Sequence, residues 1–279
     1  MPLVPFTENG YPYTVAEQKI IDYISLNLNS IHLMTIGQLS KNLNMSEATI
    51  SRFANHAGFQ NFKSMKNELM KLTEIETPAD KMSATLKENN SSEWMGFLRY
   101  QQYCIEKTIE NLSDDALTAS VDAILSARKV YIHAKGAATS LSRLLEFRLK
   151  RFGLEVELLP SAGSELFESL IHIRSEDVII LFGFQKISRE AQVLLKQRKD
   201  IPYRAILLSS RFYDHEDSRG DYNIYVYRGE PGEYHSLTAP TAVIDAMIIM
   251  IAGKLGEKSF QTLQDLHQLK QKYQVDIPR

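Results

Sequence analysis

The sequence predicts an α/β protein in two parts: an all-α N-terminal domain built around a helix-turn-helix, then a domain with a parallel five-stranded sheet between helices (α/β/α). Three observations predict this fold class. Between residues 14 and 72, apolar residues recur at helical spacing and no strand pattern competes. Between residues 130 and 227, five mostly apolar, strand-like runs are mostly separated by helical patterns, which is typical of a parallel sheet covered on both faces. With 279 residues, 44% of them hydrophobic and 24% charged, the chain is long enough for two separate cores.

Four short helices are predicted in the N-terminal part from their start signals. Thr14 and Glu17 form a capping box, in which each side chain accepts a hydrogen bond from a backbone N–H of the first turn. Thr35 and Gln38 repeat this pattern before a second helix that ends at residues 42–44, and Ser46 caps the third. The expected inward faces are Val15, Ile20, Ile24 and Leu28; Ile36, Leu39 and Leu43; Ile50, Phe53, Ala54 and Ala57; and Phe62, Met65, Leu69 and Leu72.

Residues 73–92 are the predicted connection between the domains, because they contain Pro78 and a polar tail and lack a strong buried stripe. We therefore expect a helix-turn-helix domain over residues 1–77, a linker and connecting helix over 78–105, and the α/β domain over 106–279. The predicted strands are 130–134, 156–159, 178–182, 203–208 and 222–227, and the predicted closing helices are 239–255 and 260–273.

The composition excludes several classes of protein. Thirty-two Lys and Arg against 34 Asp and Glu give a net charge of −2, so nucleic acid or an anionic membrane would have to meet a local patch. The single cysteine, Cys104, forms neither an internal disulfide nor a multi-cysteine zinc site. The first residues lack the pattern of a secretory signal, and the longest apolar runs fall short of the ~18 residues of a membrane span. We expect a cytoplasmic protein with no membrane association and no cofactor.

The second helix, a short turn and the third helix have the proportions of a helix-turn-helix, in which the start of the third helix enters the major groove of DNA. Small or hydroxyl-bearing side chains there permit close approach to base edges. Residues 41–72 carry five basic and two acidic side chains, a local excess of positive charge suited to phosphates. A structural helix bundle without a role in DNA binding shows the same helix pattern and is the alternative.

The segment IGQLSKNLNMSEATISRFANHAGFQNFKSMKNEL resembles the N-terminal helix-turn-helix of RpiR-type bacterial transcriptional regulators, most specifically in SEATISRF and GFQNFKSMK. The resemblance implies a regulator, here of carbohydrate metabolism genes, that binds a palindromic operator in double-stranded DNA. It implies that Phe53, Phe59 and Phe62 belong to the core. It places the reading surface at Ser46, Glu47, Ala48, Thr49, Ser51 and Arg52, with Lys63 and Lys66 on the phosphate backbone.

The first predicted strand runs into the loop Lys135-Gly136-Ala137-Ala138-Thr139-Ser140 and then a helix, an arrangement that holds phosphate on backbone amides. A single glycine makes neither a dinucleotide fingerprint nor a Walker loop, so a plain strand-to-helix turn is the alternative. Residues 106–255 look like a sugar isomerase (SIS) domain, the phosphosugar-binding module that follows the helix-turn-helix in RpiR-type regulators. This resemblance implies a homo-oligomer, dimer or tetramer, that senses a small metabolite such as a sugar phosphate.

Two loops depart from the family pattern, which is Gly-x-Gly-Ala-Ser after the first strand and Ser-x-Ser-Gly after the third. Ala138 replaces the first-loop serine, and Phe182 and Phe184 replace the two serines of the other loop. Three alternatives follow: a phosphosugar held by lysines and neighbouring hydroxyls, a different small molecule stacked on Phe182 or Phe184, or a domain that only dimerises. The candidate ligand-binding residues are Lys135, Gly136, Ala137, Ala138, Thr139, Ser140, Phe184, Gln185, Lys186, Ser188 and, after the fourth strand, Ser209 and Ser210.

A phosphosugar isomerase or lyase is the alternative function, and it would need a general base beside the bound sugar. Glu233 with His235 is the best candidate pair, but an enzyme has no need of a DNA-reading domain, so we expect no catalysis. The run Asp-His-Glu-Asp at residues 214–217 contains metal-ligand residue types, yet consecutive residues cannot all face one ion. We expect no metal site.

Overall fold

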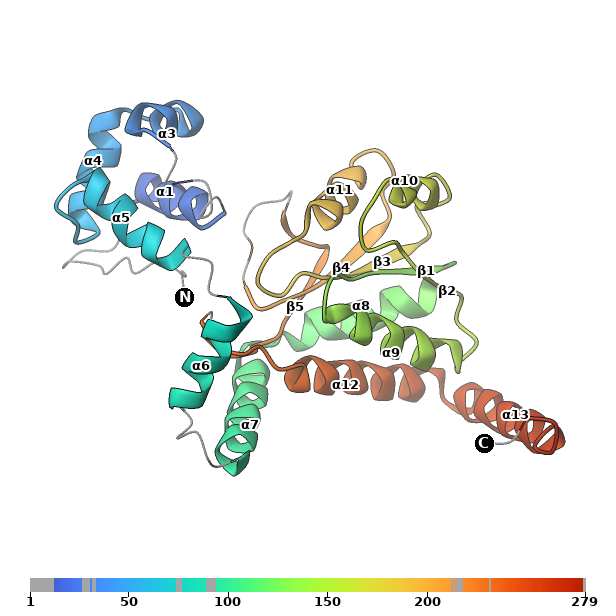
Figure 1. Ribbon diagram of the computed structural model, residues 1–279. Coiled ribbons are helices and arrows are strands. Elements are labelled where there is room, and N and C mark those ends of the chain that lie inside the picture. The colour runs from blue at the N-terminus through green and yellow to red at the C-terminus, as the bar shows by residue number, and fades with distance from the viewer. Residues whose placement is uncertain are drawn as a thin grey trace. The chain divides into compact units, whose positions relative to one another are not determined.

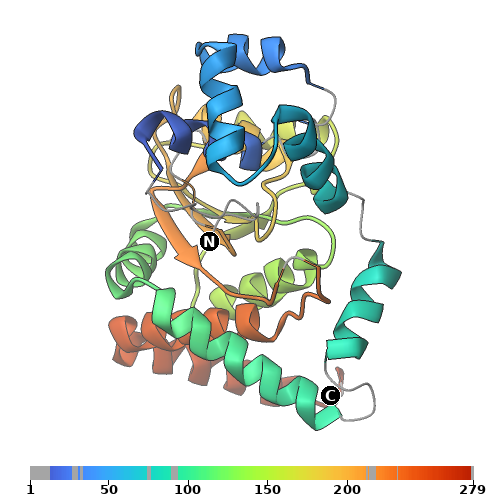
Figure 2. The same cartoon turned by 90° about the vertical axis from the view of Figure 1, so that its left-hand side faces the viewer.

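The computed structural model describes residues 13–26, 31, 34–73, 77–88, 94–211, 213, 218–230 and 232–277. They form two compact units, one made almost entirely of residues within 1–85 and one that holds nearly all of residues 86–279. In Figures 1 and 2 the first unit contains helices alone, and the second contains a sheet between helices. The predicted fold class, a helical domain followed by a parallel five-stranded α/β domain, is confirmed.

The first unit contains the four predicted helices, and both capping boxes form. Its buried residues, among them Ile24, Leu39 and Phe53, make one core. Val15 was expected on the inward face but is 79% exposed, because it is the first residue of its helix and lies outside this core. Leu28 lies outside the described residues. The helices are α1 (Val15–Leu26), α3 (Ile36–Leu43), α4 (Glu47–His56) and α5 (Phe62–Thr73).

A helix that the sequence analysis did not predict, α6 (Pro78–Glu88), lies inside the expected connection. Thr77 and Asp80 form its capping box: the N–H of Thr77 donates to Asp80 Oδ2 (2.8 Å), and the N–H of Asp80 donates to Thr77 Oγ1 (3.2 Å). Pro78 is the first helical residue, a position where the missing N–H costs no hydrogen bond. The proline that suggested a break therefore begins a helix.

The second unit is built on five parallel strands in the order β2-β1-β3-β4-β5. Val130 of β1 is in register with Val156 of β2 and Val178 of β3. The chain passes from β1 to β2 on one side and continues on the other with β3, so the carboxyl ends of β1 and β3 meet at a switch point of the topology. The strands are β1 (Val130–His133), β2 (Val156–Leu158), β3 (Val178–Phe182), β4 (Arg204–Ser209) and β5 (Tyr222–Tyr225).

Successive strand residues enter different cores on the two faces of the sheet. Val130 and Ile132 belong to the core on one face, whereas Tyr131 belongs to the core on the other. In Figure 1 helices α8, α9 and α12 lie on one side of the sheet, and α10 and α11 lie on the other. The helices of this unit are α7 (Trp94–Asn111), α8 (Asp114–Ser126), α9 (Ala138–Lys150), α10 (Glu165–Leu170), α11 (Arg189–Gln197), α12 (Thr238–Leu255) and α13 (Glu257–Lys272).

Helix α12 has 18 residues and is long and apolar enough to cross a membrane by length and composition alone. Its Ile244, Met247 and Ile251 are fully buried, and it packs against α7, α8 and α9. With these contacts, α12 is the central helix of the layer that covers one face of the sheet. Helix α13 differs, because Ser259 is its one buried residue.

Candidate functional site

Short-range hydrogen bonds fix the turn between α3 and α4. Asn44 has a left-handed backbone (φ 52°), a conformation that asparagine tolerates better than most residues. The N–H of Asn44 donates to the Lys41 carbonyl (3.3 Å), and the N–H of Met45 donates to the Ser40 carbonyl (3.0 Å). The Ser40 hydroxyl donates to the Met45 carbonyl. The turn therefore ends α3 and leaves Ser46 in extended geometry, where it caps α4.

The first turns of α4 carry the predicted DNA-reading side chains. Ser46, Glu47, Ala48 and Arg52 are exposed, and Thr49 and Ser51 are half-buried. The Ser46 hydroxyl accepts from the Thr49 N–H (3.1 Å), so it is engaged in capping. Arg52 Nε donates to the Ala48 carbonyl (3.3 Å), and within the described part of the chain its two terminal nitrogens have no partner. The arrangement offers a guanidinium group beside a small side chain.

The two lysines predicted to contact phosphates differ in their surroundings. Lys63 is exposed on α5. Lys66 is half-buried, its Nζ donates to the Met34 carbonyl (2.8 Å), and it lies 5.7 Å from the ring centroid of Phe62. Lys66 thus joins α5 to the segment before α3, whereas Lys63 is open to a phosphate.

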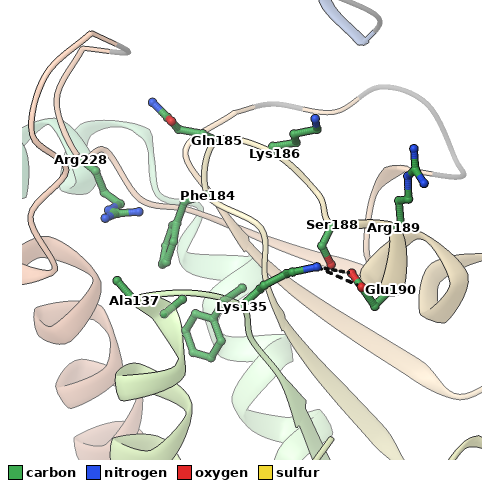
Figure 3. A pocket seen from close by; sticks show the side chains of 11 residues that line it. Lys135, Ala137, Phe184, Gln185, Lys186, Ser188, Arg189, Glu190 and Arg228 are labelled. Atoms are coloured by element: carbon green, nitrogen blue, oxygen red, sulfur yellow. Dashed lines mark hydrogen bonds and ion pairs between the residues drawn. The ribbon is translucent and has the colours of Figure 1, made fainter. Parts of the chain in front are cut away.

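In the second unit, a cavity of about 510 Å³ opens at the carboxyl ends of β1 and β3 (Figure 3). Its walls come from the loops after these two strands, the start of α11 and one residue after β5. Four lining side chains are cationic and one is acidic, so the cavity favours anions. The lining residues are Lys135, Ala137, Ala138, Phe182, Phe184, Gln185, Lys186, Ser188, Arg189, Glu190 and Arg228.

Seven of the twelve predicted ligand-binding residues line this cavity: Lys135, Ala137, Ala138, Phe184, Gln185, Lys186 and Ser188. Gly136, Thr139 and Ser140 do not. The hydroxyls of Thr139 and Ser140 donate to the carbonyls of Gly136 and Ala137 (2.8 Å each), so they close the first turn of α9.

Ser209 and Ser210 also lie outside the lining, and they connect strand ends instead. Ser210 donates its N–H to the Phe184 carbonyl (2.8 Å) and its hydroxyl to the Val226 carbonyl (2.7 Å). The N–H of Val226 donates to the Ser209 carbonyl (2.8 Å). These bonds hold the segment after β5 against the loop after β3, and that segment brings Arg228 to the cavity. Arg228 was not among the predicted ligand-binding residues, because no local motif in the sequence marks an arginine that reaches the cavity from beyond the edge strand.

Glu190 pairs with Lys135: the lysine Nζ lies 3.0 Å from Oε1 and 3.3 Å from Oε2. The backbone N–H of Glu190 and the Lys135 ammonium lower the pKa of Glu190 to about 2, so this carboxylate is ionised at neutral pH. His133 is buried beside the cavity, with Nδ1 3.1 Å from the Pro160 carbonyl and Nε2 3.3 Å from Ser188 Oγ. Burial lowers the pKa of His133, so the ring is neutral and Nδ1 donates to the carbonyl.

Neither residue of the candidate catalytic pair lines the cavity. Glu233 is buried elsewhere, and His235 Nε2 lies 2.7 Å from Gln185 Nε2. Glu190, the acidic residue of the lining, has a pKa far below the neutral range in which a general base works well. Among the described residues, no three His, Cys, Asp or Glu side chains gather where they could hold a metal ion. The acidic run at residues 214–217 lies outside the described residues.

Similarity to known proteins covers both units. Residues 8–75 match the helix-turn-helix domain of the rpiR family. An uncharacterized HTH-type transcriptional regulator of Caldanaerobacter subterraneus subsp. tengcongensis is 21% identical over 256 residues, which is 90% of each chain. The sugar isomerase domain of an RpiR transcription factor from Sphaerobacter thermophilus superimposes with a TM-score of 0.56 and 19% identity, over 61% of this chain and 96% of that one. The NanR protein of Vibrio vulnificus, complexed with ManNAc-6P, superimposes with a TM-score of 0.57 and 16% identity, over 97% of this chain and 98% of that one.

Proposed function

We propose that this chain, which carries a helix-turn-helix domain of the rpiR family and a sugar isomerase fold, is a transcriptional regulator that binds a palindromic operator under the control of an anionic sugar metabolite. The control by a metabolite is proposed from one observation, the cavity with four cationic side chains at the switch point of the sheet. Under the same proposal, the protein regulates genes of carbohydrate metabolism in the cytoplasm and does not catalyse a reaction.

The DNA-binding part of the proposal rests on the exposed start of α4. Arg52 is the group best placed to read a base edge, since arginine makes two parallel hydrogen bonds to guanine and Ala48 beside it permits close approach. The neighbouring Ser46, Glu47, Thr49 and Ser51 complete the reading surface. Lys63 contacts the phosphate backbone, and Lys66 contributes by holding α5 in place.

A sugar phosphate is the ligand class that we propose. Three observations support it: four cationic side chains surround the cavity, its volume suits a small metabolite, and a protein of the same fold is complexed with ManNAc-6P. Since aromatic rings replace the usual loop hydroxyls, the polar contacts of the ligand must come from other groups of the lining.

Control of DNA binding requires that the ligand prefer one of two states of the regulator. The ligand shifts the population by the difference between its affinities for the state that binds the operator and the state that does not. A homo-oligomer presents two reading helices to two half-sites about 10 base pairs, or a multiple, apart. Leu269 of α13 is exposed, and with Leu263 and Leu266 on the same side of the helix it supports self-association.

The test is a thermal-shift screen of the full chain against ManNAc-6P, glucose 6-phosphate and fructose 6-phosphate, each beside its unphosphorylated sugar at equal ionic strength. A ligand that binds only the folded state raises Tm, by an amount that grows with ligand concentration. We expect at least one phosphorylated sugar to raise Tm and its unphosphorylated partner to have no effect. Equal responses to both members of each pair, or no response to any of them, would contradict the proposed ligand class.

A further inference from the structure

Arg228 and Phe184 form a stacked pair in the wall of the cavity. Arg228 Cζ lies 4.6 Å from the centroid of the Phe184 ring, and that ring lies 5.9 Å from the ring of Phe182. Both rings are buried. Arg228 Nε donates to the Ser236 carbonyl (2.9 Å), and Nη2 donates to the His235 carbonyl (2.7 Å). An aromatic face and two carbonyls thus fix the guanidinium plane.

The positive charge of Arg228 is not neutralised by the residues around it. No Asp or Glu of the described chain forms an ion pair with it, and its hydrogen-bond partners among the described residues are uncharged carbonyls. Burial lowers the pKa of Arg228 to about 10, so the group stays cationic at neutral pH in surroundings that disfavour a charge. An arriving oxyanion would relieve this cost and accept charge-assisted hydrogen bonds from the free Nη1.

The other cations of the lining differ from Arg228. Lys135 is already paired with Glu190. Lys186 and Arg189 are exposed, where water screens their charge. Figure 3 shows the Lys135–Glu190 pair and Arg228 on opposite sides of the cavity, with Phe184 between them. Of the four cations, Arg228 alone is both partly buried and without a carboxylate partner among the described residues.

We propose that Arg228, stacked on Phe184, binds the oxyanion of the ligand, in place of the two loop serines that Phe182 and Phe184 replace, and that Glu190 keeps Lys135 out of ligand binding. This inference rests on the proposed function and adds the chemistry of recognition. The ligand presents a phosphate or a carboxylate to the planar guanidinium group. This group selects such a ligand by the geometry of bidentate hydrogen bonding as well as by charge.

The experiment uses inorganic phosphate as the probe, so it does not depend on the identity of the ligand. Phosphate replaces chloride at constant ionic strength, and Tm of the full chain is recorded for the wild type, Arg228→Gln, Arg228→Lys and Arg143→Gln. Arg143 is the matched control, because it is an exposed arginine of α9 that does not line the cavity. Phosphate also stabilises proteins through exclusion from their surfaces, and the control shows that general effect.

We expect the wild type and Arg143→Gln to respond alike, Arg228→Gln to lose most of the phosphate-dependent rise, and Arg228→Lys to keep less than half of it. The lysine variant keeps the charge and preserves the test if the glutamine variant does not fold. Equal responses in all four proteins would overturn the inference.

Glu190→Gln separates the two candidate anion sites. This change frees Lys135, so phosphate would bind several-fold more tightly if the lysine were the anion site. We expect its apparent Kd to change less than twofold. A larger gain, with no loss in Arg228→Gln, would assign the oxyanion to Lys135 instead.

The same variants distinguish this inference from the proposed function. A sugar phosphate that stabilises the wild type and Arg228→Gln equally would leave ligand sensing intact and overturn the role of Arg228. A phosphate response that depends on Arg228, with no response to any sugar phosphate and a response to glucuronate, would support the role of Arg228 and move the ligand to sugar acids.

Discussion

The backbone N–H of Tyr227 donates to Thr108 Oγ1 over 3.0 Å, which ties the residue before Arg228 to helix α7. Thr108 is buried, and its hydroxyl donates in turn to the Cys104 carbonyl (2.8 Å). The Tyr227 ring meets the Tyr103 ring of the same helix edge to face at 6.0 Å. Along the chain, helix α7 follows the helical N-terminal unit and precedes the sheet. Under the proposed function, a ligand that shifts Arg228 would therefore act on the helix that leads from one unit to the other.

Thr108→Val removes this hydrogen bond and keeps the shape of the side chain. We expect the ligand to bind within about threefold of its wild-type affinity, while its effect on operator affinity falls, because coupling needs a discrete element that both sites bias. The unsatisfied N–H of Tyr227 should lower the free energy of unfolding by about 1–3 kcal/mol. The measurement is the ratio of operator Kd values with and without saturating ligand.

Ser120→Ala is the matched control for that ratio. The Ser120 hydroxyl is likewise buried and donates to the carbonyl four residues earlier, at Ala116, but it belongs to α8. It should lower stability and leave the ratio unchanged. A wild-type ratio in Thr108→Val would show that α7 does not transmit the signal through this bond.

Arg52→Ala and Lys63→Ala should affect DNA binding in different ways. Loss of a base contact at Arg52 should cost about 1–3 kcal/mol on the operator and little on unrelated DNA. Loss of a phosphate contact at Lys63 should weaken all sequences alike and reduce the slope of log K against log salt by about 1. Fluorescence anisotropy at several salt concentrations measures both. If operator affinity is unchanged in both variants, α4 and α5 are not the DNA-binding surface.

Glu17 predicts a pH dependence for the first unit. Its Oε2 accepts from the Thr14 N–H (2.8 Å) while its Oε1 lies 2.7 Å from His56 Nδ1, so one carboxylate caps α1 and holds the end of α4. Burial acts to raise the pKa of Glu17, but the hydrogen bonds from Thr14 and His56 outweigh it and the pKa is lowered. The resulting stability is complete above the unfolded pKa of about 4.3 and is lost as the pH falls through the folded pKa.

Glu17→Gln should therefore be less stable than the wild type by about 1–2 kcal/mol at pH 5, and this gap should narrow by pH 3. Urea denaturation of the full chain, followed by circular dichroism, measures the gap. Glu168→Gln, at an exposed carboxylate of α10, is the control and should show almost no gap at either pH. A gap that widens toward pH 3 would contradict the lowered pKa of Glu17.

Local signals explain why most of the fold could be predicted. Each capping box involves residues three apart, and each buried strand is one continuous apolar run, so neither depends on distant parts of the chain. The run at residues 178–182 coincides with β3. Helix α6 was not predicted because a proline breaks a helix in its interior but is favoured at its first position. The capping residue Thr77 is the signal that distinguishes the two cases for Pro78.

The site was predictable only where one loop supplies several lining residues. Lys135, Ala137 and Ala138 follow β1 directly, and Phe184 to Ser188 follow β3. Arg228 comes from beyond the edge strand through hydrogen bonds to Ser209 and Ser210, which is a tertiary relationship without a sequence signal. The sequence also does not show whether the loop hydroxyls face the cavity, because a serine or threonine hydroxyl can instead donate to a backbone carbonyl of its own turn. Thr139 and Ser140 do so here.

Helix α13 predicts how the chain associates with itself. Its Leu269 is 56% exposed, and the half-buried Leu263 and Leu266 lie on the same side of the helix, because residues three apart are separated by about 60° around an α-helix. A helix of about 15 residues is marginal in water unless an apolar face packs against something. A second copy of this helix is the partner that we expect, since the proposed palindromic operator calls for two identical reading heads.

Leu269→Glu places a charge on that face and should shift the protein from an oligomer to a monomer in sedimentation velocity at about 10 μM, because an unpaired charge opposes burial between apolar surfaces. Ile171→Glu is the control, since Ile171 is 77% exposed beside α10 and outside the proposed contact. It should leave the assembly intact. The monomer should bind a single half-site as well as the wild type does but lose the added affinity of the paired site, because the second head is no longer tethered to the first. A Leu269→Glu protein that stays assembled would place the self-association surface away from α13.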